Sequence, residues 1–343
     1  MEEIVTRSRS ITTPWIERRH LQIETKKSKS YVILCCDSMI PFALKLVNMY
    51  PNRFKYIETE YKKYNDGTDN ITISGYSPEN EIAGEDVLFL ASFHSNDVTL
   101  SQFSVLIVLL QSFIESLTIV LPYYPVATNE RVEREGHVAT ANTYSMLLSN
   151  LPNVGKPTRL MLYDLHTLQN RFYFHSSTIP SLHSAIPLLL ERLKSTNITA
   201  IAFPDDGAAK RFGRTFKSAG FEEIVICGKK RDGDKRIVTI LDGDCLGKEV
   251  IIVDDLVQTG GTLYECAVTL LKKGAVKVSC FVTHGVFPNK CWQNFCKQSN
   301  GSKAVFETFW LTNSYPVTNE LPKDDCFEIL DLVPQILNDL DGF

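Results

Sequence analysis

The chain reads Val250-Ile251-Ile252-Val253-Asp254-Asp255-Leu256-Val257-Gln258-Thr259-Gly260-Gly261-Thr262-Leu263 in its C-terminal half, and this stretch predicts the fold. Its apolar start predicts a buried strand over residues 249–253, and its glycines predict a tight turn. An amphipathic helix is expected to follow over residues 262–273. A strand, a turn and a helix in this order are typical of parallel α/β sheets, in which ligands bind beyond the carboxyl ends of the strands.

The turn is suited to a phosphate group. Its glycines permit backbone conformations closed to other residues, so successive N–H groups can point into one concavity, to which the helix N-terminus adds a favourable dipole. Two adjacent carboxylates at the strand end suit the vicinal hydroxyls of a ribose whose 5-phosphate occupies the turn. The alternative is an ordinary turn in which Asp255 caps the helix. The residues expected to bind the sugar phosphate are Asp254, Asp255, Gln258, Thr259, Gly260, Gly261 and Thr262.

The alternation of strands and helices that begins with residues 249–273 extends through most of the chain. Short β-rich apolar runs predict further strands at residues 31–35, 86–91, 117–121, 160–163, 198–203, 223–226 and 277–283. Amphipathic stretches predict helices at residues 41–49, 99–115, 139–149, 185–194 and 208–219. We therefore expect an α/β fold of mainly parallel sheets flanked by helices.

The length of 343 residues exceeds what one hydrophobic core usually serves. This predicts two domains of roughly 150 residues each. Ser, Thr, His and Pro concentrate over residues 174–187 and mark a soft boundary. The predicted units are a flexible extension over residues 1–29, an N-terminal domain over 30–178, a C-terminal domain over 179–325, and a segment over 326–343 that packs back on the N-terminal domain.

Composition argues against several classes of protein. A hydrophobic fraction of 44% with 22% charged residues is typical of globular chains, and a net charge of −4 leaves no basic surplus for nucleic acid. The most apolar stretch, residues 103–126, contains Gln111 and Glu115 and falls short of the ~20 uninterrupted apolar residues of a membrane span. Nine scattered cysteines are expected as free thiols, and the polar N-terminus has no targeting pattern, so a cytoplasmic location is expected.

Three other predicted strands end in polar residues. His166 follows the strand at 160–163, and Asp205 opens the Gly-containing turn after the strand at 198–203. A loop over residues 228–236 carries five cations, among them Lys229 and Arg231. Taken one at a time, such residues are usually a structural histidine, a helix cap and a solvated charged surface.

Together these motifs resemble the ribose-phosphate diphosphokinases (phosphoribosyl diphosphate synthetases), most closely their plant-type branch. The resemblance rests on the Asp-Leu-His at 164–166, the Pro-Asp-Asp-Gly-Ala at 204–208, the Lys-x-Arg at 229–231 and the Asp-Asp…Gly-Gly-Thr at 254–262. It extends from Ser30 to near the C-terminus, through the Thr-His-Gly-Val-Phe at 283–287. It implies two type I phosphoribosyltransferase-like domains, the first on the nucleotide side and the second on the ribose 5-phosphate side.

The resemblance also implies roles for the polar strand ends. His166 and Asp205 are expected to bind the catalytic Mg²⁺, and Lys229 and Arg231 are expected to close over the triphosphate as a catalytic pair. Long cations on a closing loop suit this reaction, because phosphoryl-type transition states need charge neutralisation more than a base. The turn expected to hold the transferred diphosphate comprises Asp205, Gly207 and Ala208.

The nucleotide side departs from the best-known branch of the family. Where that branch has Arg-Gln-Asp, this chain continues Thr128-Asn129-Glu130-Arg131, and Arg131 is the expected phosphate contact. Tyr64 and Asp66 resemble a loop that reaches the adenine of a neighbouring subunit, which implies a homo-oligomer of at least two chains. By themselves, Asp66 and Gly67 are an ordinary turn.

The expected activity is Mg²⁺-dependent transfer of the β,γ-diphosphate of ATP to the 1-hydroxyl of ribose 5-phosphate, which gives phosphoribosyl diphosphate and AMP. Two alternatives are a salvage phosphoribosyltransferase and a catalytically silent regulatory subunit. The first would use the same phosphate turn, but the motifs at 164–166, 204–208 and 229–231 argue against it. The second would have lost the cations and ligands that this chain retains.

Overall fold

Two mostly parallel β-sheets form the framework of the computed structural model, which describes residues 29–153, 155–232 and 235–342. The first sheet has the order β2-β1-β5-β6-β7-β8, and every pairing in it is parallel. Its strands are β1 (Tyr31–Cys35), β2 (Phe54–Tyr56), β5 (Asp86–Leu90), β6 (Ser116–Leu121), β7 (Thr158–Tyr163) and β8 (Thr178–His183).

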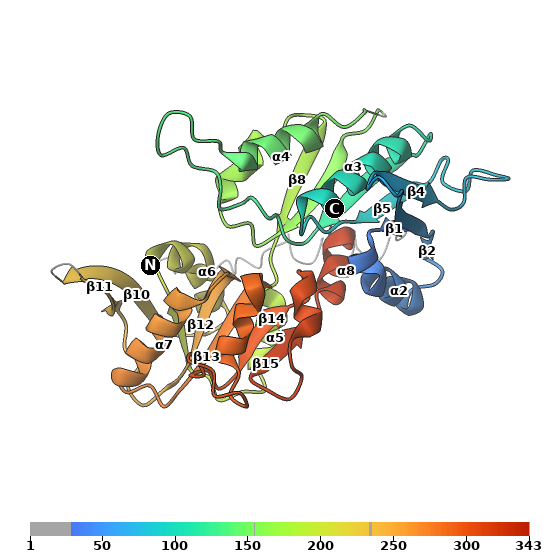
Figure 1. The fold of residues 1–343 in the computed structure, drawn as a ribbon. Helices are drawn as coiled ribbons and strands as arrows, with labels where there is room; N and C mark the ends of the chain where they lie inside the picture. Colours follow the sequence, from blue (N-terminus) through green and yellow to red (C-terminus); the bar gives the residue numbers. More distant parts are fainter. Residues whose placement is uncertain (1–28, 154, 233–234, 343) are drawn as a thin grey trace, which may run out of the picture.

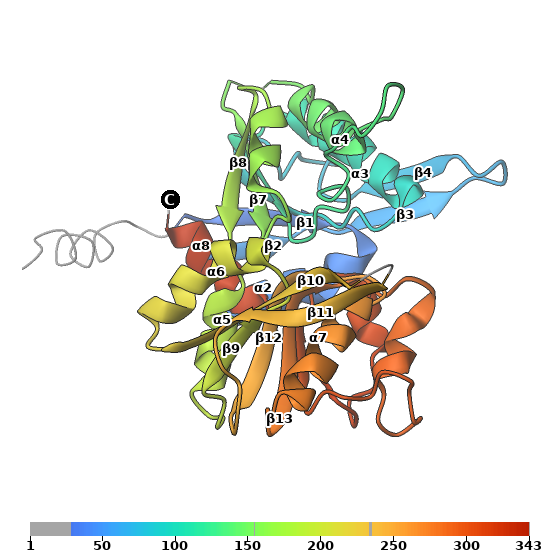
Figure 2. The same ribbon diagram turned by 90° about the vertical axis from the view of Figure 1, so that its left-hand side faces the viewer.

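The second sheet has the order β11-β10-β9-β12-β13-β14-β15, and only its β10–β11 pair is antiparallel. Its strands are β9 (Ala200–Phe203), β10 (Glu223–Asp232), β11 (Lys235–Asp242), β12 (Glu249–Val257), β13 (Lys277–Gly285), β14 (Phe309–Thr312) and β15 (Phe327–Leu330). A separate hairpin joins β3 (Thr59–Lys63) to β4 (Asp69–Ile73) and projects from the first half of the molecule (Figure 2).

Helices cover both faces of the sheets (Figure 1). Apolar side chains of α3 (Asn96–Leu110) and α4 (Thr140–Ser149) share a core with the first sheet, and those of α7 (Gly261–Lys272) share one with the second. A third core joins the two sheets through α2 (Ile40–Met49), α5 (Ile186–Leu193), α6 (Asp206–Ser218) and α8 (Val333–Asp341). The predicted fold class is confirmed. No helix in the described part of the chain is long and apolar enough to cross a membrane.

Several elements differ from the sequence prediction. β12 continues to Val257 instead of ending at residue 253, because Leu256 pairs with His284 of β13. α3 begins at Asn96, where the Ser95 side chain accepts a hydrogen bond from the Val98 amide, and it ends at Leu110. The elements that sequence periodicity did not indicate are β2, β3, β4, β8, β11, β14, β15 and α8.

The chain passes from one sheet to the other later than the predicted boundary at 178/179. β8 spans this position and pairs with β7 through His183, so the change of sheet follows His183. Within the predicted C-terminal segment, β15 belongs to the second sheet, whereas α8 lies beside α2 of the first half (Figure 1). Nearly all of the predicted extension at residues 1–29 lies outside the described residues.

α8 is tied to the first half by polar contacts as well as by its apolar side. The Tyr163 hydroxyl donates to Asp339 Oδ2 over 2.9 Å, and an Arg159 N–H donates to the Asp339 carbonyl over 3.0 Å. Arg53 pairs with Asp341 at the end of the helix. These contacts fix the two halves relative to each other next to the end of β7.

Strand order explains why distant motifs meet. β9 lies between β10 and β12 and is parallel to both, so the three strands end at one edge of the second sheet. Asp205 follows β9, the Lys229–Arg231 segment lies toward the end of β10, and Asp254 and Asp255 lie near the end of β12. Residues scattered over the sequence are thereby brought to the same edge.

Candidate active site

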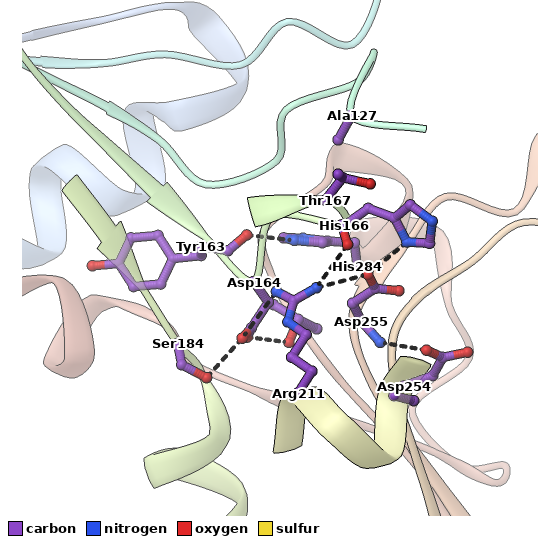
Figure 3. Close-up of polar contacts among 12 residues, drawn as sticks. Ala127, Tyr163, Asp164, His166, Thr167, Ser184, Arg211, Asp254, Asp255 and His284 are labelled. Carbon is purple, nitrogen blue, oxygen red and sulfur yellow. Dashed lines mark hydrogen bonds and ion pairs between the residues drawn. The ribbon is translucent and has the colours of Figure 1, made fainter. Parts of the chain in front are cut away.

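Asp255 occupies the junction between the two sheets (Figure 3). Its side chain is only 6% exposed, and its Oδ2 accepts hydrogen bonds from His166 Nδ1 over 2.7 Å and from Arg211 over 2.9 Å. His166 follows β7 of the first sheet, whereas Asp255 lies on β12 of the second. The carboxyl ends of β7 and β12 therefore meet at this carboxylate. Asp255 does not cap α7, whose N-cap residue is Gly260, so the alternative of an ordinary capped turn does not hold.

Arg211 connects this junction to a second carboxylate. Its guanidinium lies 3.7 Å from Asp164, and it also donates to the His166 carbonyl over 3.4 Å. Asp164 is buried and has a positive φ of 38°, and it accepts hydrogen bonds from Ser184, from the Ala185 amide and from Thr283. Because Thr283 belongs to β13, the carboxylate of Asp164 is also bound from both halves of the molecule.

A buried histidine completes the junction. His284 at the end of β13 donates from Nε2 to the Tyr163 carbonyl over 2.9 Å, and its Nδ1 lies 2.9 Å from Ser314 Oγ. Its ring also packs 5.0 Å from that of Tyr123, measured between centroids. Burial lowers the pKa of His284, which favours the neutral imidazole. We assign His284 a structural position between β13 and β7.

The two adjacent aspartates differ in their surroundings. Burial tends to raise the pKa of Asp255, but the hydrogen bond from His166 and the charges of His166 and Arg211 outweigh it, so that pKa is lowered. Burial, and then the neighbouring Asp255 carboxylate, raise the pKa of Asp254. Among the described side chains, no cation pairs with Asp254, and its Oδ1 accepts the Asp255 amide over 2.9 Å. The hydrogen bond that His166 donates to Asp255 raises the pKa of His166. Asp255 is therefore the more acidic member of the pair.

The predicted phosphate turn follows directly. Gly260 has φ 67° and ψ 17°, a left-handed conformation that favours glycine, and α7 starts at Gly261 rather than at the predicted Thr262. Gln258 and Thr259 are exposed, so the turn is open to solvent on one side. Its other side packs on Phe295, which is fully buried. An exposed backbone turn at a helix N-terminus is a suitable anion site.

Gly260→Ala is expected to weaken binding at this turn. A Cβ there would lie 2.3 Å from Phe295 Cζ, and the left-handed backbone adds strain, each effect costing about 1–3 kcal/mol. Gly261→Ala is the matched control for stability, because a Cβ at Gly261 meets nothing within 4 Å and its φ is not in the left-handed region. Thermal unfolding of both variants checks the geometry, and ribose 5-phosphate titration of Gly260→Ala checks binding. Equal loss of stability in the two variants would contradict the proposed geometry.

Asp205 caps α6 as the structural alternative predicted. Its Oδ1 accepts the Ala208 amide over 2.9 Å, and a Cβ at Gly207 would lie 3.1 Å from the same oxygen. Capping uses one lone pair of the carboxylate and leaves others for a ligand. Asp206 pairs with Lys210 one helical turn further on and is exposed. The interaction of Asp205 with metal or diphosphate stays a prediction.

The predicted catalytic pair lies on the β10–β11 hairpin. Strand pairing sets Lys229 opposite Val238 and Arg231 opposite Arg236, and residues 233–234 lie outside the described chain. The side chains of Lys229 and Arg231 are also outside what is described. The hairpin extends from the second sheet at the edge where β9 and β12 end (Figure 2).

A cavity of about 530 Å³ lies next to His166 on the side of the first sheet. Thr128, Glu130, Arg131 and His166 are among the residues that line it. Glu130, which the sequence analysis left without a role, is nearly buried and accepts hydrogen bonds from Arg131 over 3.1 Å and from Thr167 over 3.2 Å. Arg131 is 82% exposed at the rim. This cavity gives the predicted phosphate contact a place beside the junction.

The remaining predicted nucleotide contacts lie elsewhere in the chain. Tyr64 and Asp66 are in the loop of the β3–β4 hairpin, where Asp66 accepts hydrogen bonds from the Thr68 amide and hydroxyl, and Gly67 has φ 87°. This is the ordinary Asp-Gly turn of the structural alternative. Within the described chain, no hydrogen bond or ion pair joins Tyr64 or Asp66 to the junction. Their role in a neighbouring subunit stays a prediction.

Comparison with known proteins finds relatives that carry the same name, ribose-phosphate pyrophosphokinase. Ribose-phosphate pyrophosphokinase 3, chloroplastic, of Oryza sativa subsp. japonica is 44% identical over 319 residues, which cover 91% of this chain and 76% of the relative. Ribose-phosphate pyrophosphokinase 4 of the same organism is 42% identical over 92% of this chain and 97% of the relative.

The chain belongs to the ribose-phosphate pyrophosphokinase family. The predicted family, also called the ribose-phosphate diphosphokinases, and the predicted enzyme class are thereby confirmed. The mitochondrial ribose-phosphate pyrophosphokinase 3 of Spinacia oleracea is 45% identical over 80% of this chain and 68% of the relative. Phosphoribosylpyrophosphate synthetase from Mycobacterium smegmatis matches the structure with a TM-score of 0.74 at 20% identity, covering 92% of this chain and 98% of that one, so it supports the fold. No family model matches the chain.

Sequence reasoning about this pyrophosphokinase gave no role to Asp164, Arg211 or His284. Asp164 and His284 lie inside motifs that carried the resemblance, whereas Arg211 follows the motif at 204–208. Arg211 lies in the second turn of α6, and its partners come from other elements. The only sequence signal was a basic residue closely following the diphosphate turn, and this is common on helix surfaces.

No ready-made metal centre is present in the described part of the pyrophosphokinase chain: no three His, Cys, Asp or Glu side chains converge there as ligands. His166 nevertheless has a geometry suited to a ligand. Its Nδ1 donates a hydrogen bond to a carboxylate, an arrangement that orients many metal-binding histidines. The lone pair of Nε2 is then the one that can coordinate a metal ion. The chain thus offers isolated ligands, and phosphate oxygens and water would supply the others, as is usual for Mg²⁺.

Proposed function

We propose that this protein transfers the β,γ-diphosphate of ATP to the 1-hydroxyl of ribose 5-phosphate. The hydroxyl oxygen attacks the β-phosphorus, the bond from this phosphorus to the α,β-bridging oxygen breaks, and AMP leaves while the hydroxyl proton passes to solvent. Besides family membership, one observation of the structure supports the proposal. The ends of β7 and β12 meet in the His166–Asp255 hydrogen bond, next to an exposed turn suited to phosphate.

Ribose 5-phosphate is assigned to the second sheet. Asp254 and Asp255 accept hydrogen bonds from the ribose hydroxyls, and residues 258–262 hold the 5-phosphate through backbone N–H groups and threonine hydroxyls. The ionised state of Asp255 supports this role, because a carboxylate accepts hydrogen bonds from both hydroxyls.

ATP is assigned to the junction and to the cavity on the first sheet. The cavity beside His166 supports an assignment of Arg131 to phosphate, and the turn containing Asp205, Gly207 and Ala208 is proposed to hold the transferred diphosphate. Lys229 and Arg231 stabilise the negative charge that develops during transfer. Tyr64 and Asp66 are proposed to contact the adenine of a neighbouring subunit, which makes the enzyme at least a dimer.

Mg²⁺ is the proposed cofactor, with His166 and Asp205 as the residues that hold it. When bound, it would neutralise charge on the triphosphate and polarise it toward attack. Asp255 orients the His166 ring through Nδ1, and this is the contribution that the chain itself makes before the ion binds.

A cytoplasmic location is also part of the proposal. All nine cysteines are free thiols in the structure, and burial raises the pKa of several of them, as for Cys280. Similar enzymes carry the words chloroplastic and mitochondrial in their names. Fluorescence microscopy of the tagged full chain tests the compartment directly.

Purified protein incubated with ribose 5-phosphate, ATP and Mg²⁺ is expected to form AMP and phosphoribosyl diphosphate in equal amounts. EDTA is expected to abolish both products. Asp255→Asn should lose most of this activity, whereas Asp206→Asn, which removes an exposed carboxylate paired only with Lys210 among its described contacts, should retain it. A panel of ATP, GTP and CTP determines the donor. Consumption of phosphoribosyl diphosphate with a free base, and no AMP from ATP, would overturn the proposal in favour of a salvage transferase.

A further inference from the structure

The outer side of the phosphate turn is held by a segment that follows β13. This segment comprises the short 3-10 helix at Pro288–Phe295 and the chain from 296 to 308, which leads to β14. Cys291 donates from Sγ to the Gln258 carbonyl over 3.2 Å, and Lys303 donates from Nζ to the Thr259 carbonyl over 2.9 Å. Side chains from this segment thus bind two successive carbonyl groups of the turn.

The aromatic ring of Phe295 fixes the third residue. It lies so close to Gly260 that a Cβ there would be 2.3 Å from Cζ, and it is itself packed among Phe287, Phe306 and Phe309. The backbone at 258–260 is therefore held from behind by a thiol, an ammonium and a rigid ring. When the carbonyl groups of a turn are bound by the segment behind it, the N–H groups of the turn are available to an anion on the opposite, solvent-exposed side.

Lys303 also adds a positive charge that has no acidic partner among the described residues. Among the described residues, no carboxylate lies within ion-pair distance of its ammonium, which lies 5.7 Å from the centroid of the Phe295 ring. Lys297 in the same segment differs, because it pairs with Glu307 and donates to the Glu307 carbonyl. An uncompensated cation held on the carbonyl of a phosphate turn favours a dianion in that turn.

We infer that Lys303 is a positioning residue for the 5-phosphate of ribose 5-phosphate: it fixes the Thr259 carbonyl and adds positive charge behind the turn. Cys291 assists by binding the Gln258 carbonyl. The inference rests on the proposed function, since it concerns how the same turn selects a sugar phosphate. It assigns a binding contribution to a residue that none of the sequence motifs contains.

Calorimetric titration of the full chain with ribose 5-phosphate tests this. Lys303→Met is expected to weaken binding about tenfold, as the loss of a charged hydrogen bond does. Lys303→Arg should stay within about threefold of the parent, and Lys303→Gln, which keeps a donor without charge, should fall between them. Lys297→Met is the matched control and should leave the affinity unchanged.

Kinetics separate positioning from a general structural role. In Lys303→Met, KM for ribose 5-phosphate should rise about tenfold, while KM for ATP, kcat at saturating substrate and the melting temperature stay near the parent values. The inference would be overturned if Lys303→Met also lost ATP affinity, kcat and melting temperature. It would also be overturned if the parent chain bound ribose 5-phosphate and Lys303→Met bound it equally well. Failure of the parent chain to bind ribose 5-phosphate would instead contradict the proposed function.

Discussion

Alanine in place of Arg231, or of Lys229, is expected to slow turnover by about 10²–10³-fold, by analogy with the loss of one preorganised donor to a developing charge. The hairpin that carries both residues leaves the second sheet at the edge where Asp205, Asp254 and Asp255 lie, which is where the proposed function puts the triphosphate. Because the effect arises in the transition state, kcat should fall more than substrate affinity.

The control for this experiment lies in the same hairpin. Lys230→Ala removes one positive charge from between the two residues of the Lys-x-Arg pair but leaves both members of the pair in place. Turnover at saturating ATP and ribose 5-phosphate should then stay within a few-fold of the parent. Near-normal turnover of both Lys229→Ala and Arg231→Ala would remove the catalytic assignment.

Arg211→Met is expected to destabilise the fold by about 3 kcal/mol, the lower end of the cost of removing one partner from a buried ion pair. The Arg211 side chain is 14% exposed and neutralises Asp164 and Asp255, which are 2% and 6% exposed. Without it, Asp164 and Asp255 both lose their guanidinium partner, and Asp255 keeps only the hydrogen bond from His166 among its described side-chain contacts. Because the two aspartates belong to different halves, the loss should also shift Asp255 away from the position proposed for ribose binding and reduce activity. Urea unfolding followed by circular dichroism measures the stability.

The neighbouring residue supplies the control for Arg211. Lys210 is exposed and pairs only with Asp206 among its described contacts, so Lys210→Met should leave the unfolding midpoint unchanged. The double variant Arg211→Met with Asp164→Asn should be less destabilised than the sum of the single variants, because the first change already leaves Asp164 uncompensated. Additive effects would show that the two side chains do not act together.

Periodicity and turn chemistry predicted the strands whose ends form the site, since β1, β5, β6, β7, β9, β12 and β13 are short buried apolar runs followed by polar residues. The elements that were missed have weaker local signals. β14 and β15 have four residues each, and β8 contains one proline, one serine and one histidine among its six residues. Such strands form because an adjacent parallel strand is already in place, which is a non-local cause.

In the candidate site too, features with local causes were predicted and contacts between distant residues were not. Local chemistry indicated the Gly-containing turn at 258–262 and the capping carboxylate of Asp205, and the structure has this turn and this cap. Phosphate binding by the turn stays a prediction. The contacts of Arg211 and Lys303 were not predicted, because each binds a residue more than forty positions away in the chain, Asp255 and Thr259 respectively.

The amino-acid sequence alone therefore determined the α/β class, the family and the Gly-containing turn, because strand, turn and helix propensities and motif spacing act between near neighbours. Tertiary structure decided which aspartate is the more acidic, how the two sheets are joined and what holds the turn. These properties depend on burial and on charges brought together through space: the guanidinium of Arg211 reaches Asp255 only because β9 lies beside β12.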